Sequence, residues 1–160
     1  MPTPKFILDL REKIGHDLLW LTGLSAVVLN DDGEVLLVQR ADNGRWSLIG
    51  GILEPGEEPA VAVVREIQEE TAVEAQVDRL LSIEAIPPAA YPNGDRVQFL
   101  DLCFSCRPLA GEPRVNDDES TAVAWWPLTA LPAELTAREH LRIQRALSPT
   151  DQPVYITAAD

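Results

Sequence analysis

A chain of 160 residues is long enough to form one domain with a substantial hydrophobic core. Apolar residues make up 46% and charged residues 24%, which is typical of globular proteins and excludes disordered, collagen-like and coiled-coil classes. The 26 acidic residues outnumber 13 Lys and Arg, and the formal net charge of −13 repels nucleic-acid backbones and anionic membrane surfaces. We therefore expect neither a nucleic-acid polymer nor a membrane as a partner.

The two cysteines, Cys103 and Cys106, are too few for a disulfide framework, and we predict that both are reduced and buried. Because they lie three positions apart in a predicted strand, they should face opposite sides of the sheet. Near the N-terminus, Asp9 directly follows the apolar residues 6–8, so neither a signal peptide nor a membrane span is expected. The expected location is the cytoplasm.

The order of the predicted elements follows from apolar spacing and from turn-forming residues. In chain order they are a helix over residues 5–15, strands over 21–29 and 34–39, a loop over 50–56, a helix over 59–71, strands over 77–86, 96–106 and 122–126, and a helix over about 132–147. No repeat or linker interrupts this series. We predict a single α+β domain over residues 1–160, with helices layered on a mixed sheet.

The segment 54–70 holds six glutamates and is the most informative part of the chain. On a helix that advances about 100° per residue, Glu66, Glu69 and Glu70 share one side, next to an apolar arc. Like charges three or four positions apart destabilise a helix by roughly 0.2–0.5 kcal/mol per pair, and only Arg65 offsets them locally. Such a face is unfavourable unless something positive binds to it.

A divalent cation would reverse this repulsion, because Mg²⁺ and Mn²⁺ prefer carboxylate oxygens and keep open positions for water and phosphate. Bound beside a diphosphate, such an ion would neutralise the leaving group and lower the pKa of an attacking water. The alternative is a solvated acidic face that binds nothing. Three glutamates on one helix do not by themselves decide between the two interpretations.

The full spacing resembles the Nudix hydrolase signature over residues 51–73. That signature is a glycine, five residues, a glutamate, seven residues, Arg-Glu, an aliphatic residue, any residue, Glu-Glu, any residue, a glycine and an aliphatic residue. The matching positions are Gly51, Glu57, Arg65, Glu66, Ile67, Glu69, Glu70 and Val73. Similar flanking strands extend the resemblance over most of positions 21–147, and it points to the MutT-like and ADP-ribose pyrophosphatase-like members.

The resemblance implies a Nudix-type α/β/α sandwich with a mixed sheet between helices, and metal-dependent hydrolysis of a nucleoside diphosphate linked to another moiety. Magnesium or manganese would be the cofactor. By position, the metal ligands would be Glu66, Glu69, Glu70 and the backbone carbonyl of Gly50.

Two further residues of the signature would organise these ligands. Arg65 can pair with several carboxylates at once, and Glu57 would help to hold it in place. The sequence departs from the family at Ala72, which replaces the last glycine, and at Ile49, which replaces a common proline. Ala72 should adopt a left-handed backbone at the helix end, at a cost of about 1 kcal/mol. Both departures concern loop geometry, because no ligand is lost.

Family members often carry a further carboxylate, a base or an extra ligand, on the loop before the late tryptophan-bearing strand. Residues 116–120 form that segment here, and we favour Glu119 as the base, with Asp118 second. A plain acidic turn that serves solubility is the alternative. Glu66 is the other candidate base, and the sequence does not choose between it and Glu119.

The substrate is less well specified. In the family, a proline about fifteen residues beyond the signature is associated with ADP-ribose, and a tyrosine slightly further on with diadenosine polyphosphates. Pro88 and Tyr91 occupy both places, although a proline-rich loop also has these residues for its turns. Tyr91 could stack on a base, and Arg40, Arg45 or Arg96 could bind phosphate oxygens. We favour an ADP-ribose-like nucleotide sugar over a nucleoside triphosphate.

Two alternatives to an enzyme stay open: a Nudix-fold module that binds a nucleotide without cleaving it, and a non-catalytic acidic interaction domain. The intact glutamates 66, 69 and 70 argue against the first. Asp101 lies within an otherwise apolar strand and needs a buried partner that the sequence does not identify. The apolar segment 18–21 and the helix before it could form a homodimer contact.

Overall fold

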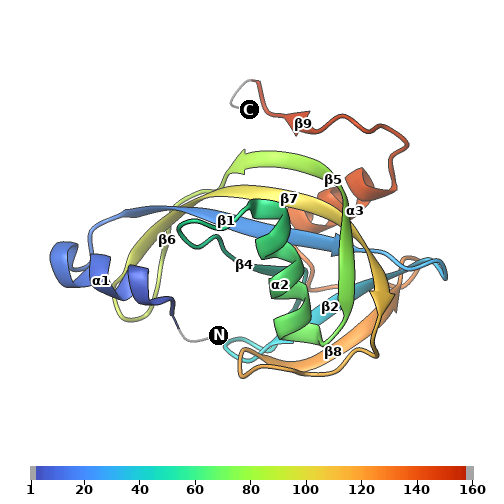
Figure 1. Ribbon diagram of the computed structural model, residues 1–160, viewed down its shortest axis with the longest axis horizontal. Coiled ribbons are helices and arrows are strands. Elements are labelled where there is room, and N and C mark those ends of the chain that lie inside the picture. The colour runs from blue at the N-terminus through green and yellow to red at the C-terminus, as the bar shows by residue number, and fades with distance from the viewer. Residues whose placement is uncertain (1–2, 158–160) are drawn as a thin grey trace.

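The computed structural model describes residues 3–157, which form three helices and nine strands in that range (Figure 1). In chain order these elements are α1 (Lys5–Ile14), β1 (Leu19–Val28), β2 (Glu34–Arg40), β3 (Trp46–Ser47), β4 (Ile49–Ile52), α2 (Pro59–Thr71), β5 (Glu74–Ala85), β6 (Ala89–Ala90), β7 (Arg96–Ala110), β8 (Ser120–Pro127), α3 (Ala137–Leu147) and β9 (Val154–Tyr155). None of the helices within this range is long and apolar enough to cross a lipid bilayer.

The strands form two sheets, and the larger one is mixed. Its order is β4-β1-β7-β5-β9, with β6 added along β7, and the smaller sheet has the order β3-β2-β8. Strands β1 and β7 run parallel over ten residue pairs, from Leu19 opposite Val97 to Val28 opposite Cys106. β4 and β5 are antiparallel to β1 and β7, respectively. This pairing brings β4 alongside the long central strands.

Helices α2 and α3 cover opposite faces of the larger sheet. On one face, Val63 and Ile67 of α2 pack in a core with Ala26 and Cys106. On the other face, Ile143 of α3 packs in a second core with residues that include Cys103. Because successive side chains of a strand alternate between faces, the two cysteines point to opposite sides, as the sequence predicts. Both are free and buried.

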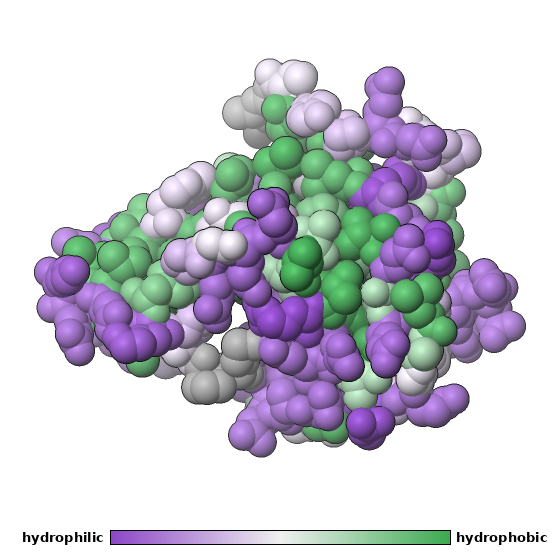
Figure 2. Space-filling view, viewed as in Figure 1, coloured by the Kyte–Doolittle hydropathy of each residue, from purple (hydrophilic) through white to green (hydrophobic). Residues whose placement is uncertain are grey.

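Helix α1 packs at the far end of the sheet, where it extends from the body of the molecule (Figure 1). Ile7 lies there in a small core with Leu19 and Val97. In the space-filling view this end carries both hydrophilic and hydrophobic residues, and hydrophobic residues also gather near α2 (Figure 2). Leu18 and Trp20 are 40% and 56% exposed, which leaves them accessible to a second copy of the chain. The homodimer contact stays a prediction.

The observed helix bounds differ from the predicted ones mainly in α3. This helix begins at Ala137 and not near 132, because Thr136 forms a capping box with Glu139. The Thr136 hydroxyl accepts a bond from the Glu139 backbone (3.2 Å), and the Glu139 carboxylate accepts one from the Thr136 backbone (2.7 Å). Helix α2 has its predicted bounds, and α1 ends one residue before Gly15.

The predicted loop over residues 50–56 is wrong in its first part, because Gly50 and Gly51 lie in strand β4. These glycines do not form a turn; they allow neighbouring atoms of Leu24 and Glu66 to lie close to the backbone of β4. A Cβ atom on Gly50 would lie 2.8 Å from the Leu24 carbonyl oxygen, so no side chain fits at this position. The short strands β3, β6 and β9 were also absent from the prediction, since two-residue strands have no periodicity to detect.

Candidate active site

The acidic side of α2 is turned into the molecule. Glu66 and Glu70, one helical turn apart, are only 5% and 7% exposed, whereas the Glu69 side chain is 42% exposed. A solvated acidic face would leave all three in water. Carboxylates are rarely buried without a partner, because burial removes their hydration. The helix therefore presents two sheltered carboxylates to the strand that faces it.

Strand β4 is shaped to receive these carboxylates. A Cβ atom on Gly51 would lie 2.1 Å from the carboxyl carbon of Glu66, so only glycine lets the side chain rest against the strand. Leu53 donates its N–H to the Thr22 carbonyl of β1 (3.0 Å). In an antiparallel pair, alternate residues direct their backbone N–H and carbonyl toward the neighbouring strand. Leu53 faces β1 in this way, so Gly50, three residues earlier, directs its N–H and carbonyl away from β1. There its N–H donates to the carboxylate of Glu70.

Arg65 holds the glutamates on the outer side of the site. Its Nε and Nη2 donate to the two oxygens of Glu57, both at 2.9 Å, which is a bidentate pair. Its Nη1 donates to Glu66 at 3.1 Å and to Glu69 at 3.0 Å. The guanidinium lowers the pKa of Glu57, and the surrounding carboxylates raise the pKa of Arg65. Arg65 therefore fixes the orientation of three carboxylates, and its role in organising metal ligands stays a prediction.

The interior of the site carries more negative than positive charge. Burial raises the pKa of Glu70 to about 8, and the charges of Glu66, Asp117 and Glu119 add to this effect. Burial also raises the pKa of Glu66, although Arg65 opposes the shift. Within residues 3–157, no Lys or Arg pairs with Glu70. A cation at this point would relieve both the desolvation and the repulsion.

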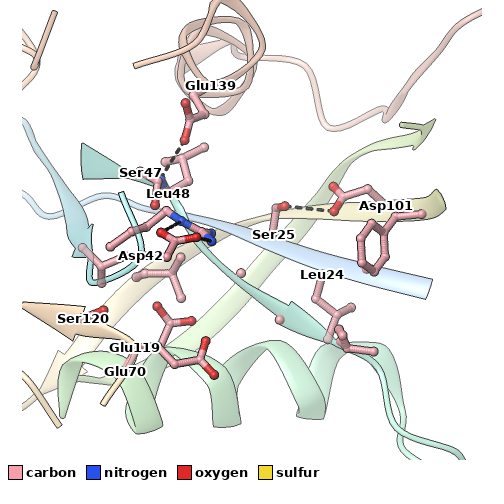
Figure 3. A pocket seen from close by; sticks show the side chains of 18 of the residues that line it. Leu24, Ser25, Asp42, Ser47, Leu48, Glu70, Asp101, Glu119, Ser120 and Glu139 are labelled. Atoms are coloured by element: carbon pink, nitrogen blue, oxygen red, sulfur yellow. Dashed lines mark hydrogen bonds and ion pairs between the residues drawn. The ribbon is translucent and has the colours of Figure 1, made fainter. Parts of the chain in front are cut away.

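The loop before β8 brings a further carboxylate to this cluster. Asp117 accepts hydrogen bonds from the backbone of Glu119 (3.1 Å) and of Ser120 (3.2 Å), which fixes the turn. The Glu119 carbonyl accepts a bond from the backbone of Ala41 (2.7 Å). In Figure 3 the Glu119 side chain lies beside Glu70, and Asp118 also lines the cavity. Both residues favoured as the base are therefore at the site, as is Glu66.

The donor set matches a hard divalent cation: carboxylates of Glu66, Glu69 and Glu70, and the carbonyl of Gly50. Among the described residues, no three His, Cys, Asp or Glu side chains already converge on one point. The reason is visible in the contacts, since Arg65 engages Glu66 and Glu69. Glu70 is buried and has no cationic partner within residues 3–157, which is expected of a carboxylate that binds a metal ion.

A cavity of about 740 Å³ opens beside these carboxylates. Gly50, Gly51, Glu70, Asp118 and Glu119 line its acidic end. Among the other lining residues labelled in Figure 3, Ser25 and Asp101 come from β1 and β7 and Glu139 from α3, and they lie above the acidic end in that view. The cavity is large enough to contain a nucleotide-sized ligand.

The structure brings only some of the candidate substrate-binding residues to the cavity. Arg40 and Tyr91 line it, and Arg40 forms a bidentate pair with Asp42 (2.9 and 2.6 Å). Arg45 lines a smaller adjoining cavity instead. Arg96 lines neither of the two, since it begins β7, where its carbonyl accepts a hydrogen bond from Arg11. Of the two substrate markers, Tyr91 is at the cavity, whereas Pro88 is exposed and outside its lining.

The partner of Asp101 is Arg142 of α3. Arg142 donates to Asp101 at 2.6 Å and to the Ser25 hydroxyl at 2.9 Å, and Ser25 donates to Asp101 at 3.0 Å. All three line the cavity and are less than 9% exposed. Burial raises the pKa of Asp101, although Arg142 and Ser25 oppose this. Sequence reasoning missed Arg142, and its only signal was the need of Asp101 for a partner.

The family model described as the NUDIX domain matches residues 21–147. The chain belongs to the NUDIX family. The predicted membership is thereby confirmed, and so is the predicted Nudix α/β/α fold, because solved NUDIX structures share this architecture. Ala72, at the end of the family signature, has the predicted left-handed backbone, with φ of 59° and ψ of 14°.

Three similar proteins illustrate the range of the family. The chain is 41% identical over 102 residues to a "MutT-like protein" of Streptomyces ambofaciens, which covers 64% of this chain and 60% of that protein. It is 35% identical over 124 residues to the human "8-oxo-dGDP phosphatase NUDT18", covering 74% and 36%. The solved ADP-ribose pyrophosphatase of Streptococcus suis 89-1591 has 25% identity, a TM-score of 0.64, and coverage of 83% and 96%. The chain thus spans about three fifths of one of these curated relatives and about a third of the other.

Proposed function

We propose that this NUDIX chain hydrolyses the pyrophosphate bond of a nucleoside diphosphate derivative with the help of Mg²⁺ or Mn²⁺. The observation that carries the proposal is the pair of buried carboxylates, Glu66, which rests against Gly51 of β4, and Glu70, which lines one end of a cavity. Acidic groups are costly in that position unless they serve a bound cation. The family relationship supports the same chemistry.

Glu66, Glu69, Glu70 and the Gly50 carbonyl would hold the ion. When bound, it supplies positive charge to the diphosphate oxygens and lowers the pKa of a coordinated water. Arg65 keeps Glu57, Glu66 and Glu69 in register, because one guanidinium contacts all three carboxylates. Ligand orientation of this kind controls how tightly a metal is bound.

Two carboxylates can accept the proton of the attacking water. Glu119 lies on a loop fixed by Asp117 and lines the cavity. Glu66 is the other candidate, because burial raises its pKa toward the range in which a carboxylate is a better base. Glu119→Gln separates the two roles: if Glu119 is the base, kcat falls and metal affinity is kept. Glu66→Gln should weaken metal binding in either case, because Glu66 also belongs to the proposed ligand set.

We favour an ADP-ribose-like nucleotide sugar as substrate, ahead of a nucleoside triphosphate. Arg40 and Tyr91 at the cavity support a nucleotide ligand of either kind, since a guanidinium binds phosphate and a phenol ring stacks on a base. The similarity to an ADP-ribose pyrophosphatase favours the nucleotide sugar. An 8-oxo-purine nucleoside diphosphate is the second candidate, because the relative NUDT18 is named for that substrate.

A panel of ADP-ribose, 8-oxo-dGDP and nucleoside triphosphates, incubated with Mg²⁺ or Mn²⁺ at mildly alkaline pH in ¹⁸O-labelled water, tests the proposal. Mass analysis of the products identifies both the substrate and the phosphorus that is attacked. Ligand-induced thermal stabilisation without turnover of any compound would favour a non-catalytic nucleotide-binding module instead. Neither turnover nor any metal-dependent change in stability would indicate an acidic interaction domain.

A further inference from the structure

A second, smaller cavity of about 330 Å³ adjoins the first and has a different lining. It is bounded by Arg40, Asn43, Arg45, Trp46, Ser47, Thr136, Arg138, Glu139 and Arg142. Four of its nine lining residues are arginines and only one is a carboxylate. In a chain with a net charge of −13, this local excess of positive residues is opposite in sign to the rest of the molecule.

Two of these arginines are already paired with carboxylates. Arg40 binds Asp42 through two hydrogen bonds, and Arg142 binds Asp101. Their charges are thereby largely neutralised, although each guanidinium retains further N–H groups.

The other two arginines keep most of their donors. Arg45 gives one N–H to the neutral carbonyl of Glu134, and within residues 3–157 it has no carboxylate partner. Arg138 lies 3.9 Å from Glu84, which is beyond hydrogen-bond distance, and Arg145 already holds that carboxylate. Glu139, the single acid in the lining, is engaged by the backbone of Thr136 and of Leu48. Unused positive charge therefore remains at this cavity.

Arg142 also borders this cavity, but its unpaired donor is buried behind the cavity wall. Its side chain is only 7% exposed, and its Nε atom has no hydrogen-bond partner among the described residues. A buried guanidinium donor without a partner costs free energy, so such groups are uncommon in folded proteins. The residue lines both cavities, but Nε itself has almost no accessible surface, so the donors open to a ligand at the smaller cavity are those of Arg45 and Arg138.

The two cavities form one continuous site. Arg40, Ser47, Glu139 and Arg142 line both of them. In Figure 3, Ser47 and Glu139 lie across the larger cavity from Glu70 and Glu119. A ligand whose diphosphate is held at the acidic end would extend its remaining part toward the arginines.

We propose that the smaller cavity is a subsite for a second phosphate, a phosphate monoester on the ribose of the nucleotide substrate. The inference rests on the proposed function, because it places the diphosphate at the acidic end. Arg45 precedes β3 and Arg138 belongs to α3, so the donors approach from different elements. A phosphate monoester has three terminal oxygens that accept bonds from several directions, whereas a carboxylate accepts in one plane.

Binding of adenosine monophosphate and of its 2′,5′- and 3′,5′-bisphosphates, measured by calorimetry with Mg²⁺ present, tests the subsite. At least one bisphosphate should bind about tenfold tighter than the monophosphate, as one or two charge-assisted hydrogen bonds would give. Arg138→Gln should reduce this preference to about twofold or less. Arg107→Gln, which removes the same charge from an exposed pair with Asp78 outside both cavities, should keep it.

Equal affinity for all three compounds would overturn the inference, and so would an equal loss of preference in both variants, which would indicate a long-range charge effect. A parallel assay of ADP-ribose hydrolysis reports on the proposed function separately. Turnover of ADP-ribose without a bisphosphate preference rejects the subsite alone. A bisphosphate preference that Arg138→Gln abolishes upholds the subsite even where turnover is absent. Circular dichroism of each variant confirms that it is folded.

Discussion

The two ends of the main cavity handle charge in different ways. At the acidic end, Glu70 is buried beside other carboxylates and has no cationic partner among the described residues. At the opposite wall, buried Asp101 is matched by Arg142 and Ser25 with hydrogen bonds of 2.6–3.0 Å. The first end gains from an added cation, whereas at the second the charge of Asp101 is already paired with that of Arg142. A stable protein can therefore contain unfavourable charge, provided that it is confined to the place where a ligand would bind.

The largest expected effect concerns the buried ion pair between Asp101 and Arg142, opposite the acidic end of the cavity. Asp101→Ala leaves Arg142 buried without its carboxylate and should lower the free energy of unfolding by about 3–5 kcal/mol. Urea denaturation measures the change. Asp78→Ala, which breaks the exposed pair with Arg107, should cost less than about 1 kcal/mol.

A compensating double variant sharpens this test. Asp101→Leu combined with Arg142→Met removes both charges, so most of the stability lost in Asp101→Ala should return. If the double variant is no more stable than Asp101→Ala, the contribution of Asp101 and Arg142 to stability comes from their packing and not from their charges.

The next effect concerns turnover at the acidic end. Glu70→Gln keeps the shape of the side chain and removes one charged ligand, so kcat for the best substrate should fall by at least about 100-fold. Glu74→Gln makes the same change at an exposed position on the first residue of β5 and should leave kcat unaltered. Steady-state kinetics with Mg²⁺ decides the matter, and undiminished turnover in Glu70→Gln would remove Glu70 from the ligand set.

The same variant should behave differently without metal. Burial raises the pKa of Glu70 from 4.5 to about 8 in the folded state. A raised carboxyl pKa means that the folded state holds the proton more tightly, so its contribution is complete below pH 4.5 and is lost as the pH rises through about 8. In EDTA, the parent protein should therefore lose stability between pH 6 and pH 8.5.

Glu70→Gln cannot lose this proton. Relative to the parent it should gain on the order of 1 kcal/mol over that pH interval, as measured by urea unfolding at both pH values. Added Mg²⁺ should stabilise the parent more than the variant. If the free energy of unfolding depends on pH in the same way in both proteins, ionisation of Glu70 does not destabilise the folded state.

The smallest effect lies at the end of α2. Ala72 has a positive φ of 59°, which disfavours a side chain, so Ala72→Gly should stabilise the protein by up to about 1 kcal/mol. Ala60→Gly, within the first turn of the same helix, should instead destabilise it by about 0.5–1 kcal/mol. Opposite signs in chemical denaturation would confirm that backbone conformation is responsible.

Most of the acidic end was predictable because its residues are close together in the sequence. Glu66 and Glu70 are one turn apart, and Arg65 reaches Glu69 across another turn, so helical geometry alone aligns them. The position of Ala72 at the helix end follows from the same local register. Thr136 and Glu139 also have a local capping signature, and the predicted start of the last helix near 132 was wrong because that signature was overlooked.

The opposite wall was not predictable in this way. Ser25, Asp101 and Arg142 are separated by 76 and 41 positions, and no periodic pattern relates them. Likewise, Gly50 and Gly51 resemble a loop in sequence, and only their closeness to Leu24 and Glu66 shows why they are glycines in a strand. Arg96 was a reasonable phosphate-binding candidate by charge, yet its place at the start of β7 keeps it outside both cavities.

The sequence by itself determined the helix that carries the acidic residues, the spacing of its glutamates and the family to which the chain belongs. Short-range geometry is sufficient for these features, because a helix fixes which side chains share a face. Only the tertiary structure decided which carboxylates are buried, which arginine faces Asp101 and which arginines surround a common cavity. These depend on contacts between distant segments, which form when the strands pair and α3 packs against the sheet.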